Sequence, residues 1–259
     1  MRKSMNEEEE LKEFDSCVRE SCPDLIMLLV SGSAAHGEMT ERSDVDGTVF
    51  VECSSRSKLE NYVNRFDSLA RHEFGKPVED GFYDPHWSLF LYPEGTIRDK
   101  ETFAEFHNGL PVDFTMFNLK ENSLLLRGED LRSEFPVEYS SGMIDEWASF
   151  APSYHLERAE RLAEVEDRVR ACYALSRSIL QATRVLVWKE AECTSSSYRE
   201  IVSAYRELNG SGSLPIWALE ARERNFNLPL EEIRNRLELS DRFVRHILQE
   251  EVYRRDQLD

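Results

Sequence analysis

Short apolar runs separated by turn residues dominate the first half of the chain. Residues 25–30 (LIMLLV), 47–52 (GTVFVE) and 87–92 (WSLFLY) are each short enough to form one buried strand. Residues 111–117 (PVDFTMF) alternate between apolar and polar positions, which predicts a further strand. Helical spacing predicts the flanking helices at residues 6–21, 59–69 and 121–132. We therefore expect an α/β (α+β) domain with a mixed sheet.

The second half of the chain has helical spacing throughout, and none of its segments has the pattern of a strand. Apolar positions predict one or two long helices over residues 156–189. The predicted buried face carries Leu162, Val165, Val169, Cys172, Leu175, Ile179, Ala182 and Leu186. Shorter helices are predicted at residues 198–208, 216–224 and 230–248. Pro136, Ser140-Ser141-Gly142 and Pro152 interrupt the chain without periodicity. We expect a boundary near residue 150, with an α/β domain at residues 1–150 and an all-α helical bundle at residues 151–259.

Two aspartates open the second predicted strand. Asp44 and Asp46 are two residues apart, so in an extended chain their carboxylates project to the same face. The two carboxylates repel each other unless a cation lies between them. Mg²⁺ is commonly bound by a few carboxylates together with substrate phosphates. The turn at Gly32-Ser33 suits a phosphate cradle, because glycine allows close backbone approach and serine supplies a hydroxyl. Ser43 can add a second hydroxyl.

Asp113 is the third candidate acid. It lies in the apolar segment 111–117, where an isolated carboxylate would be poorly solvated. Beside Asp44 and Asp46 it would complete a metal site of three carboxylates.

This combination of motifs resembles the DNA polymerase beta-like nucleotidyltransferase superfamily. Gly32-Ser33 is followed, after ten residues, by Asp44-Val45-Asp46, and Asp113 comes later. The resemblance implies that Asp44 and Asp46 hold two Mg²⁺ ions, that Asp113 binds one of them and acts as the base for the attacking hydroxyl, and that ATP is the co-substrate. A surface loop with two solvated aspartates is the alternative interpretation.

The helical half is similar to the helical domain of aminoglycoside adenylyltransferases of the streptomycin and spectinomycin type. Residues 167–177 (DRVRACYALSR) and 219–222 (LEAR) show this likeness. It implies that Arg177 contacts ATP and that Asp167 binds the cationic group of the drug. The ATP-contacting lysine of that family has Lys189 as its nearest counterpart, out of register. Arg177 in a helix salt bridge and Asp167 as a solvated acid are the alternatives.

The charge of the chain restricts the class of substrate. The formal net charge is −18. The chain therefore lacks the excess of basic residues that is typical of proteins that bind a nucleic-acid backbone. An acidic cleft would attract a cationic small molecule, whereas general surface acidity would serve solubility or a salty cytoplasm. No apolar run reaches membrane-spanning length and the N-terminus is charged, so we expect a cytoplasmic protein without membrane contact.

Together these features predict a Mg²⁺-dependent nucleotidyltransferase that moves AMP from ATP to a hydroxyl of a small cationic acceptor, with an aminoglycoside as the first candidate. One alternative is an antitoxin-like adenylyltransferase that modifies a partner protein, although such proteins usually lack a long helical domain. The other is a catalytically silent nucleotide-binding protein, which would have no need of three acids. The sequence predicts no oligomeric state.

Overall fold

The structure is a computed structural model that describes residues 7–40, 43–53, 55–74, 87–107, 109–149, 151–191, 193–209 and 212–255. The chain divides into two compact units, Met1–Tyr139 and Ser140–Asp259. The division precedes helix α5 (Ser141–Ala148), which therefore groups with the helices, whereas the boundary predicted near residue 150 follows that helix.

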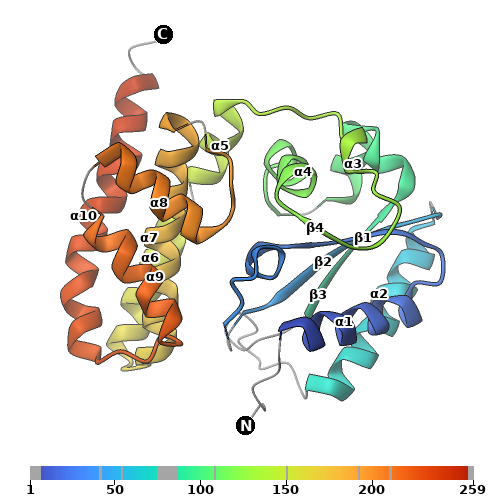
Figure 1. Cartoon of the computed structure of the whole chain (residues 1–259), viewed down its shortest axis with the longest axis horizontal. Coiled ribbons are helices and arrows are strands. Elements are labelled where there is room, and N and C mark those ends of the chain that lie inside the picture. The colour runs from blue at the N-terminus through green and yellow to red at the C-terminus, as the bar shows by residue number, and fades with distance from the viewer. Residues whose placement is uncertain are drawn as a thin grey trace. The chain divides into compact units, whose positions relative to one another are not determined.

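The first unit is built on a four-stranded mixed sheet (Figure 1). The strands lie in the order β3-β2-β1-β4, where β1 pairs antiparallel with both β2 and β4, and β2 pairs parallel with β3. The predicted mixed sheet is thus confirmed, together with its first three strands. The strands are β1 (Leu25–Ser31), β2 (Val45–Val51), β3 (Trp87–Pro93) and β4 (Leu124–Gly128).

The strand predicted at residues 111–117 is wrong. These residues begin helix α4 (Val112–Glu121), which buries Phe114, Met116, Phe117 and Leu119. Spacings of three between Phe114 and Phe117 and between Met116 and Leu119 place them on a helical face, although the same segment also alternates. The amide and hydroxyl of Thr115 both donate to the Pro111 carbonyl, at 2.9 and 3.0 Å, which stabilises the first turn.

The helix predicted at residues 121–132 is also wrong, because strand β4 and a short 3₁₀ turn, η3 (Arg132–Glu134), replace it. Pairing of β4 with β1 supplies backbone hydrogen bonds between distant parts of the chain, and this overrides the helical preference of the leucines.

Helices cover both faces of the sheet (Figure 1). Helices α1 (Glu7–Ser21) and α2 (Arg56–Phe74) lie on one face, and α3 (Lys100–Phe106), with α4, lies on the other. The helices predicted at residues 6–21 and 59–69 are thereby confirmed. The short 3₁₀ helices η1 (Gly32–His36) and η2 (Glu94–Ile97) follow β1 and β3.

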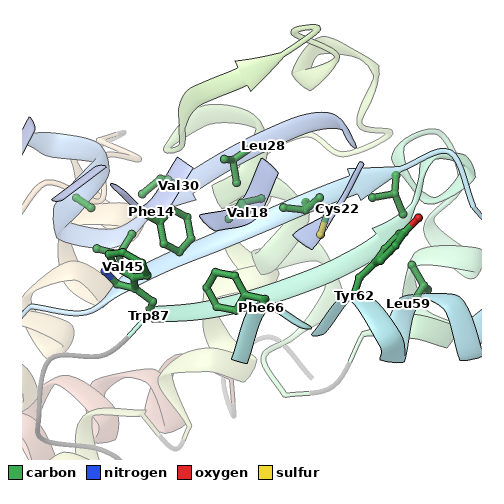
Figure 2. Close-up of a cluster of buried hydrophobic side chains, with 13 residues drawn as sticks. Phe14, Val18, Cys22, Leu28, Val30, Val45, Leu59, Tyr62, Phe66 and Trp87 are labelled. Carbon is green, nitrogen blue, oxygen red and sulfur yellow. The ribbon is translucent and has the colours of Figure 1, made fainter. Parts of the chain in front are cut away.

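A buried cluster fixes α1 and α2 against the sheet (Figure 2). Its centre is Phe14, whose ring packs edge-on against Phe66 at 5.7 Å and Trp87 at 5.3 Å between centroids. A β-carbon at Gly47 would lie only 2.5 Å from the Phe14 ring, so glycine at this position lets α1 pack directly over β2. Val45, Val49 and Val51 belong to the same cluster, so the odd-numbered positions of β2 face α1 and α2.

The second unit is helical in all its described residues that have regular structure. Its central helix, α7 (Arg168–Glu190), contacts each of the other helices of the unit and buries apolar residues along most of its length. The other helices are α5, α6 (Ala151–Glu164), α8 (Tyr198–Asn209), α9 (Ser213–Glu223) and α10 (Leu230–Arg255). Among the described helices, none is long and apolar enough to cross a membrane.

Candidate functional site

The turn that follows β1 has a backbone shape that requires glycine. Gly32 begins the 3₁₀ turn η1 with φ +69°, and Gly37 caps its end with φ +65°. Glycine adopts such positive φ angles without a steric penalty. The Ser33 carbonyl accepts hydrogen bonds from the amides of Gly37 and Glu38, the latter at 2.9 Å. Gly32 is exposed and Ser33 is half-buried, so a ligand can reach the turn.

Strand pairing brings this turn to the predicted acid pair. Ser31 at the end of β1 pairs with Asp46 near the start of β2, so Gly32 and Ser33 follow directly at the same edge of the sheet. Val45 is buried against α1, and strand alternation therefore places Asp46 on the opposite face. Asp44 immediately precedes β2, and both aspartates are half-buried.

The two aspartates fit a hard divalent cation. Their carboxylates offer oxygen donors next to the Gly32-Ser33 turn, and Mg²⁺ is commonly bound by one or two carboxylates together with substrate phosphates. The position on β3 directly paired with Asp46 is Ser88, so the neighbouring strand presents a hydroxyl there. Sequence patterns do not reveal this pairing, because it depends on the register between distant strands.

Ser43 holds the loop that leads into β2. Its hydroxyl accepts a hydrogen bond from the Thr40 amide at 2.8 Å and lies 3.2 Å from the Thr40 hydroxyl. The residue is buried, and its own amide donates to the Thr40 carbonyl at 3.0 Å. In this arrangement Ser43 fixes the backbone immediately before Asp44.

Asp113 lies in the first turn of α4, and its carboxylate forms an ion pair with Lys100 at the start of α3. Both side chains are close to half exposed. Within the described residues, no group of three or more acidic, histidine or cysteine side chains is arranged to hold a metal. The three-carboxylate arrangement expected from the sequence is therefore not assembled there, and Asp44 with Asp46 are the donors that the sheet edge provides. Lys100 was not anticipated, because its pairing depends on two helices that meet in the folded unit.

In the helical unit, Asp167 is the N-cap of α7. Its carboxylate accepts a hydrogen bond from the Arg170 amide at 3.2 Å and lies 3.6 Å from the Arg170 Nε. Helix α6 ends just before it, where Glu166 has φ +61°. An aspartate at this position accepts a hydrogen bond from an otherwise unpaired backbone amide of the first turn, and its negative charge is stabilised by the positive end of the helix dipole.

Arg177 lies in the middle of α7 and donates a hydrogen bond to the Tyr173 hydroxyl at 2.7 Å. Lys189, near the end of the same helix, forms an ion pair with Asp145 of α5. Both basic side chains are carried by α7 and are half-buried.

His155 of α6 is affected by the Arg177 charge. Burial, reinforced by that positive charge, lowers the pKa of His155 from 6.5 to about 3. The imidazole is thus neutral in the folded protein at neutral and mildly acidic pH.

Because the folded-state pKa lies below the unfolded value, the stability that neutral His155 contributes is complete above pH 6.5. This stability is lost as the pH falls from 6.5 towards 3, because His155 becomes protonated in the unfolded chain but stays neutral in the folded protein. We expect wild-type protein to lose roughly 1–2 kcal/mol of unfolding free energy between pH 7 and pH 5 through this residue. His155→Gln should lose correspondingly less in urea denaturation at the two pH values, and equal losses in the two proteins would contradict the assignment.

Comparison with known proteins gives the context of this site. No protein-family model and no curated protein matches the chain. Among solved structures, the chain resembles spectinomycin adenyltransferase AAD(9) from Enterococcus faecialis, which was crystallised with ATP and spectinomycin. The match has a TM-score of 0.51 and 14% sequence identity, and it covers 94% of this chain and 100% of the other. The resemblance predicted from the motifs is confirmed at the level of the fold, which this chain shares with that adenyltransferase.

Proposed function

We propose that this protein transfers AMP from ATP, with Mg²⁺, to a hydroxyl group of a small cationic acceptor. The observation that carries the proposal is the pairing of Ser31 with Asp46, which joins the Gly32-Ser33 turn to the aspartate pair at one edge of the sheet. A phosphate cradle beside two carboxylates suits a bound metal–nucleotide complex. The fold shared with an adenyltransferase crystallised with ATP and spectinomycin supports the choice of nucleotide and acceptor class.

In this mechanism Asp44 and Asp46 would hold Mg²⁺, which would supply positive charge to neutralise the phosphates. The backbone at Gly32 and the Ser33 hydroxyl bind the triphosphate, and Ser43 keeps Asp44 in place. The α-phosphorus–oxygen bond to pyrophosphate breaks as the acceptor oxygen attacks, and pyrophosphate leaves.

Asp113 is the proposed acceptor of the proton from the attacking hydroxyl. In the structure its carboxylate is paired with Lys100, so this role requires the ion pair to open. An exposed ion pair of this kind contributes only about 0–1 kcal/mol, so its opening is a small barrier.

The proposal assigns two further roles to three residues of the helical unit. Arg177 and Lys189 supply positive charge to the triphosphate, and guanidinium suits bidentate phosphate contact. Asp167 binds the cationic group of the acceptor. An N-cap carboxylate retains lone pairs beyond the one used by the Arg170 amide, so it can also accept from an ammonium group.

Mass spectrometry of acceptors incubated with the protein, ATP and Mg²⁺ tests the proposal. Spectinomycin and streptomycin are the first acceptors to use, and the expected product carries one added AMP. A broad aminoglycoside panel that is neither modified nor bound, while ATP and Mg²⁺ do bind, would refute the acceptor assignment and make the hydroxyl of a partner protein the next acceptor to test.

Ser33→Ala should weaken ATP binding by about 1.5–3 kcal/mol, the usual contribution of a hydrogen bond to a charged group. Calorimetric titration with MgATP measures the change. Ser57→Ala is the matched control, because Ser57 is an exposed serine on α2 that hydrogen-bonds to Ser55. Equal affinities in the two variants would count against the cradle.

A further inference from the structure

Strand alternation determines which side chains of β3 lie on the same face of the sheet as Asp46. Trp87, Leu89 and Leu91 pack in or against the cluster beneath α1 and α2. Ser88 and Phe90 therefore project to the opposite face, which is also the face of Asp46. Figure 2 shows Trp87 on the clustered side, beside Phe14.

The register places both residues close to the acid pair. Ser88 pairs directly with Asp46, and Phe90 pairs with Thr48, two residues further along. With strands about 4.8 Å apart and a rise of about 3.3 Å per residue, the α-carbons of Asp46 and Phe90 are separated by about 8 Å. A small molecule bound at Asp46 can therefore reach the Phe90 ring.

Phe90 is unusual on this face because it is not covered. Further along, Tyr92 stacks on Phe103 of α3 with centroids 4.6 Å apart, and Phe50 packs against Tyr92 at 5.7 Å. Tyr92 and Phe50 are buried, whereas Phe90 is 47% exposed. Helix α3 thus packs over one end of the face, whereas, within the described part of this unit, the Phe90 ring stays exposed towards the end that carries Asp46.

The order of the strands separates the two sides of the proposed reaction. The Gly32-Ser33 turn extends from β1, on one side of β2, whereas Ser88 and Phe90 lie on β3, on the other side. In an in-line displacement the attacking and leaving oxygens lie on opposite sides of the phosphorus. If pyrophosphate leaves over the turn, the acceptor hydroxyl approaches from the side of β3.

We propose that Ser88 and Phe90 line the acceptor subsite, with the Phe90 ring as the surface on which a cationic, hydroxyl-bearing ring compound lies. This inference rests on the proposed function and adds two residues of the sheet to its acceptor side. The face of an aromatic ring attracts cations, and its apolar surface suits the C–H groups of a sugar-like ring. The Ser88 hydroxyl, next to Asp46, can donate to or accept from the acceptor hydroxyl.

Calorimetric titration of spectinomycin into protein saturated with Mg²⁺ and a non-hydrolysable ATP analogue tests this subsite. Phe90→Ala should raise the Kd for spectinomycin about 5- to 30-fold, whereas the Kd for the ATP analogue should not change. Phe90→Trp should retain spectinomycin binding, because it keeps the aromatic face. Leu124→Ala is the matched control, since Leu124 is a 38% exposed apolar residue on the opposite edge strand, β4. It should leave both affinities unchanged.

The outcomes separate this inference from the proposed function. Equal spectinomycin affinity in wild type and Phe90→Ala would overturn the subsite, as would a loss of affinity for the ATP analogue in place of spectinomycin. Wild-type protein that binds the analogue but not spectinomycin would overturn the subsite as stated while leaving the nucleotide site intact. Wild-type protein that binds neither compound would instead refute the proposed function.

Discussion

Asp44→Asn is expected to lower the rate of AMP transfer by roughly 10²–10³-fold, the range seen when one strong electrostatic contact to the reacting group is removed. The amide keeps the shape of the side chain but removes the negative charge that is proposed to hold Mg²⁺. The fold should be unaffected, because Asp44 is half-buried and immediately precedes β2. The measurement is steady-state turnover at saturating ATP, with the Mg²⁺ concentration varied.

Asp113→Asn is the informative comparison. Both acids serve the proposed reaction, but Asp113 lies on α4 and is paired with Lys100, whereas Asp44 immediately precedes β2 beside Asp46. Asp44→Asn should therefore raise the Mg²⁺ concentration needed for half-maximal activity, whereas Asp113→Asn should lower turnover with the wild-type Mg²⁺ requirement. Near-wild-type turnover of Asp44→Asn at saturating Mg²⁺ and ATP would show that the metal assignment is wrong.

Gly128→Ala should produce the largest loss of stability, about 3 kcal/mol or more. Gly128 has φ +90°, and a β-carbon there would lie 1.9 Å from the Ile26 carbonyl oxygen. Because that oxygen belongs to the backbone of β1, the added carbon can be accommodated only if β4 moves away from β1. Urea denaturation followed by circular dichroism measures the change.

Two glycines provide the controls for this prediction. Gly95→Ala should change stability by no more than about 0.5 kcal/mol, because a β-carbon there meets no atom within 4 Å and φ is not positive. Gly32→Ala should fall between the two, since Gly32 has φ +69° but open space around it. If Gly128→Ala is as stable as Gly95→Ala, β4 does not approach the β1 backbone this closely at Gly128.

The parts of the sheet that were predictable are those with one dominant pattern. The run LIMLLV is too short for a helix of typical length and ends in a serine-glycine turn, so β1 was predicted almost residue by residue. Residues 111–117 satisfy both the two-residue and the helical period, and burial against neighbouring elements decided in favour of the helix. For β4, five residues give too little periodicity to compete with the helical preference of leucine.

An exposed valine misled the interpretation of the helical half. Val165 was assigned to a buried face, but it is 73% exposed, at the break between α6 and α7. It continued the apolar spacing through a point where the chain turns, so Asp167 looked like a residue of a helix face when it is the N-cap of α7. A capping aspartate is hard to recognise when the preceding helix runs to within a few residues of it.

For the candidate site, local motifs identified Gly32, Ser33, Asp44 and Asp46, which strand pairing brings to one edge. Residues that depend on non-local contacts were beyond the reach of local patterns. The Lys100–Asp113 ion pair needs the approach of two helices, and the place of Ser88 beside Asp46 needs the register of β3.

The products formed from ATP test the central claim most directly. Wild-type protein with Mg²⁺, ATP and spectinomycin should release one pyrophosphate for each AMP added to the acceptor, and Asp44→Asn should form neither product at a comparable rate. Release of ADP and phosphate without AMP on the acceptor, or equal pyrophosphate release by both proteins, would contradict nucleotidyl transfer at the Asp44–Asp46 site.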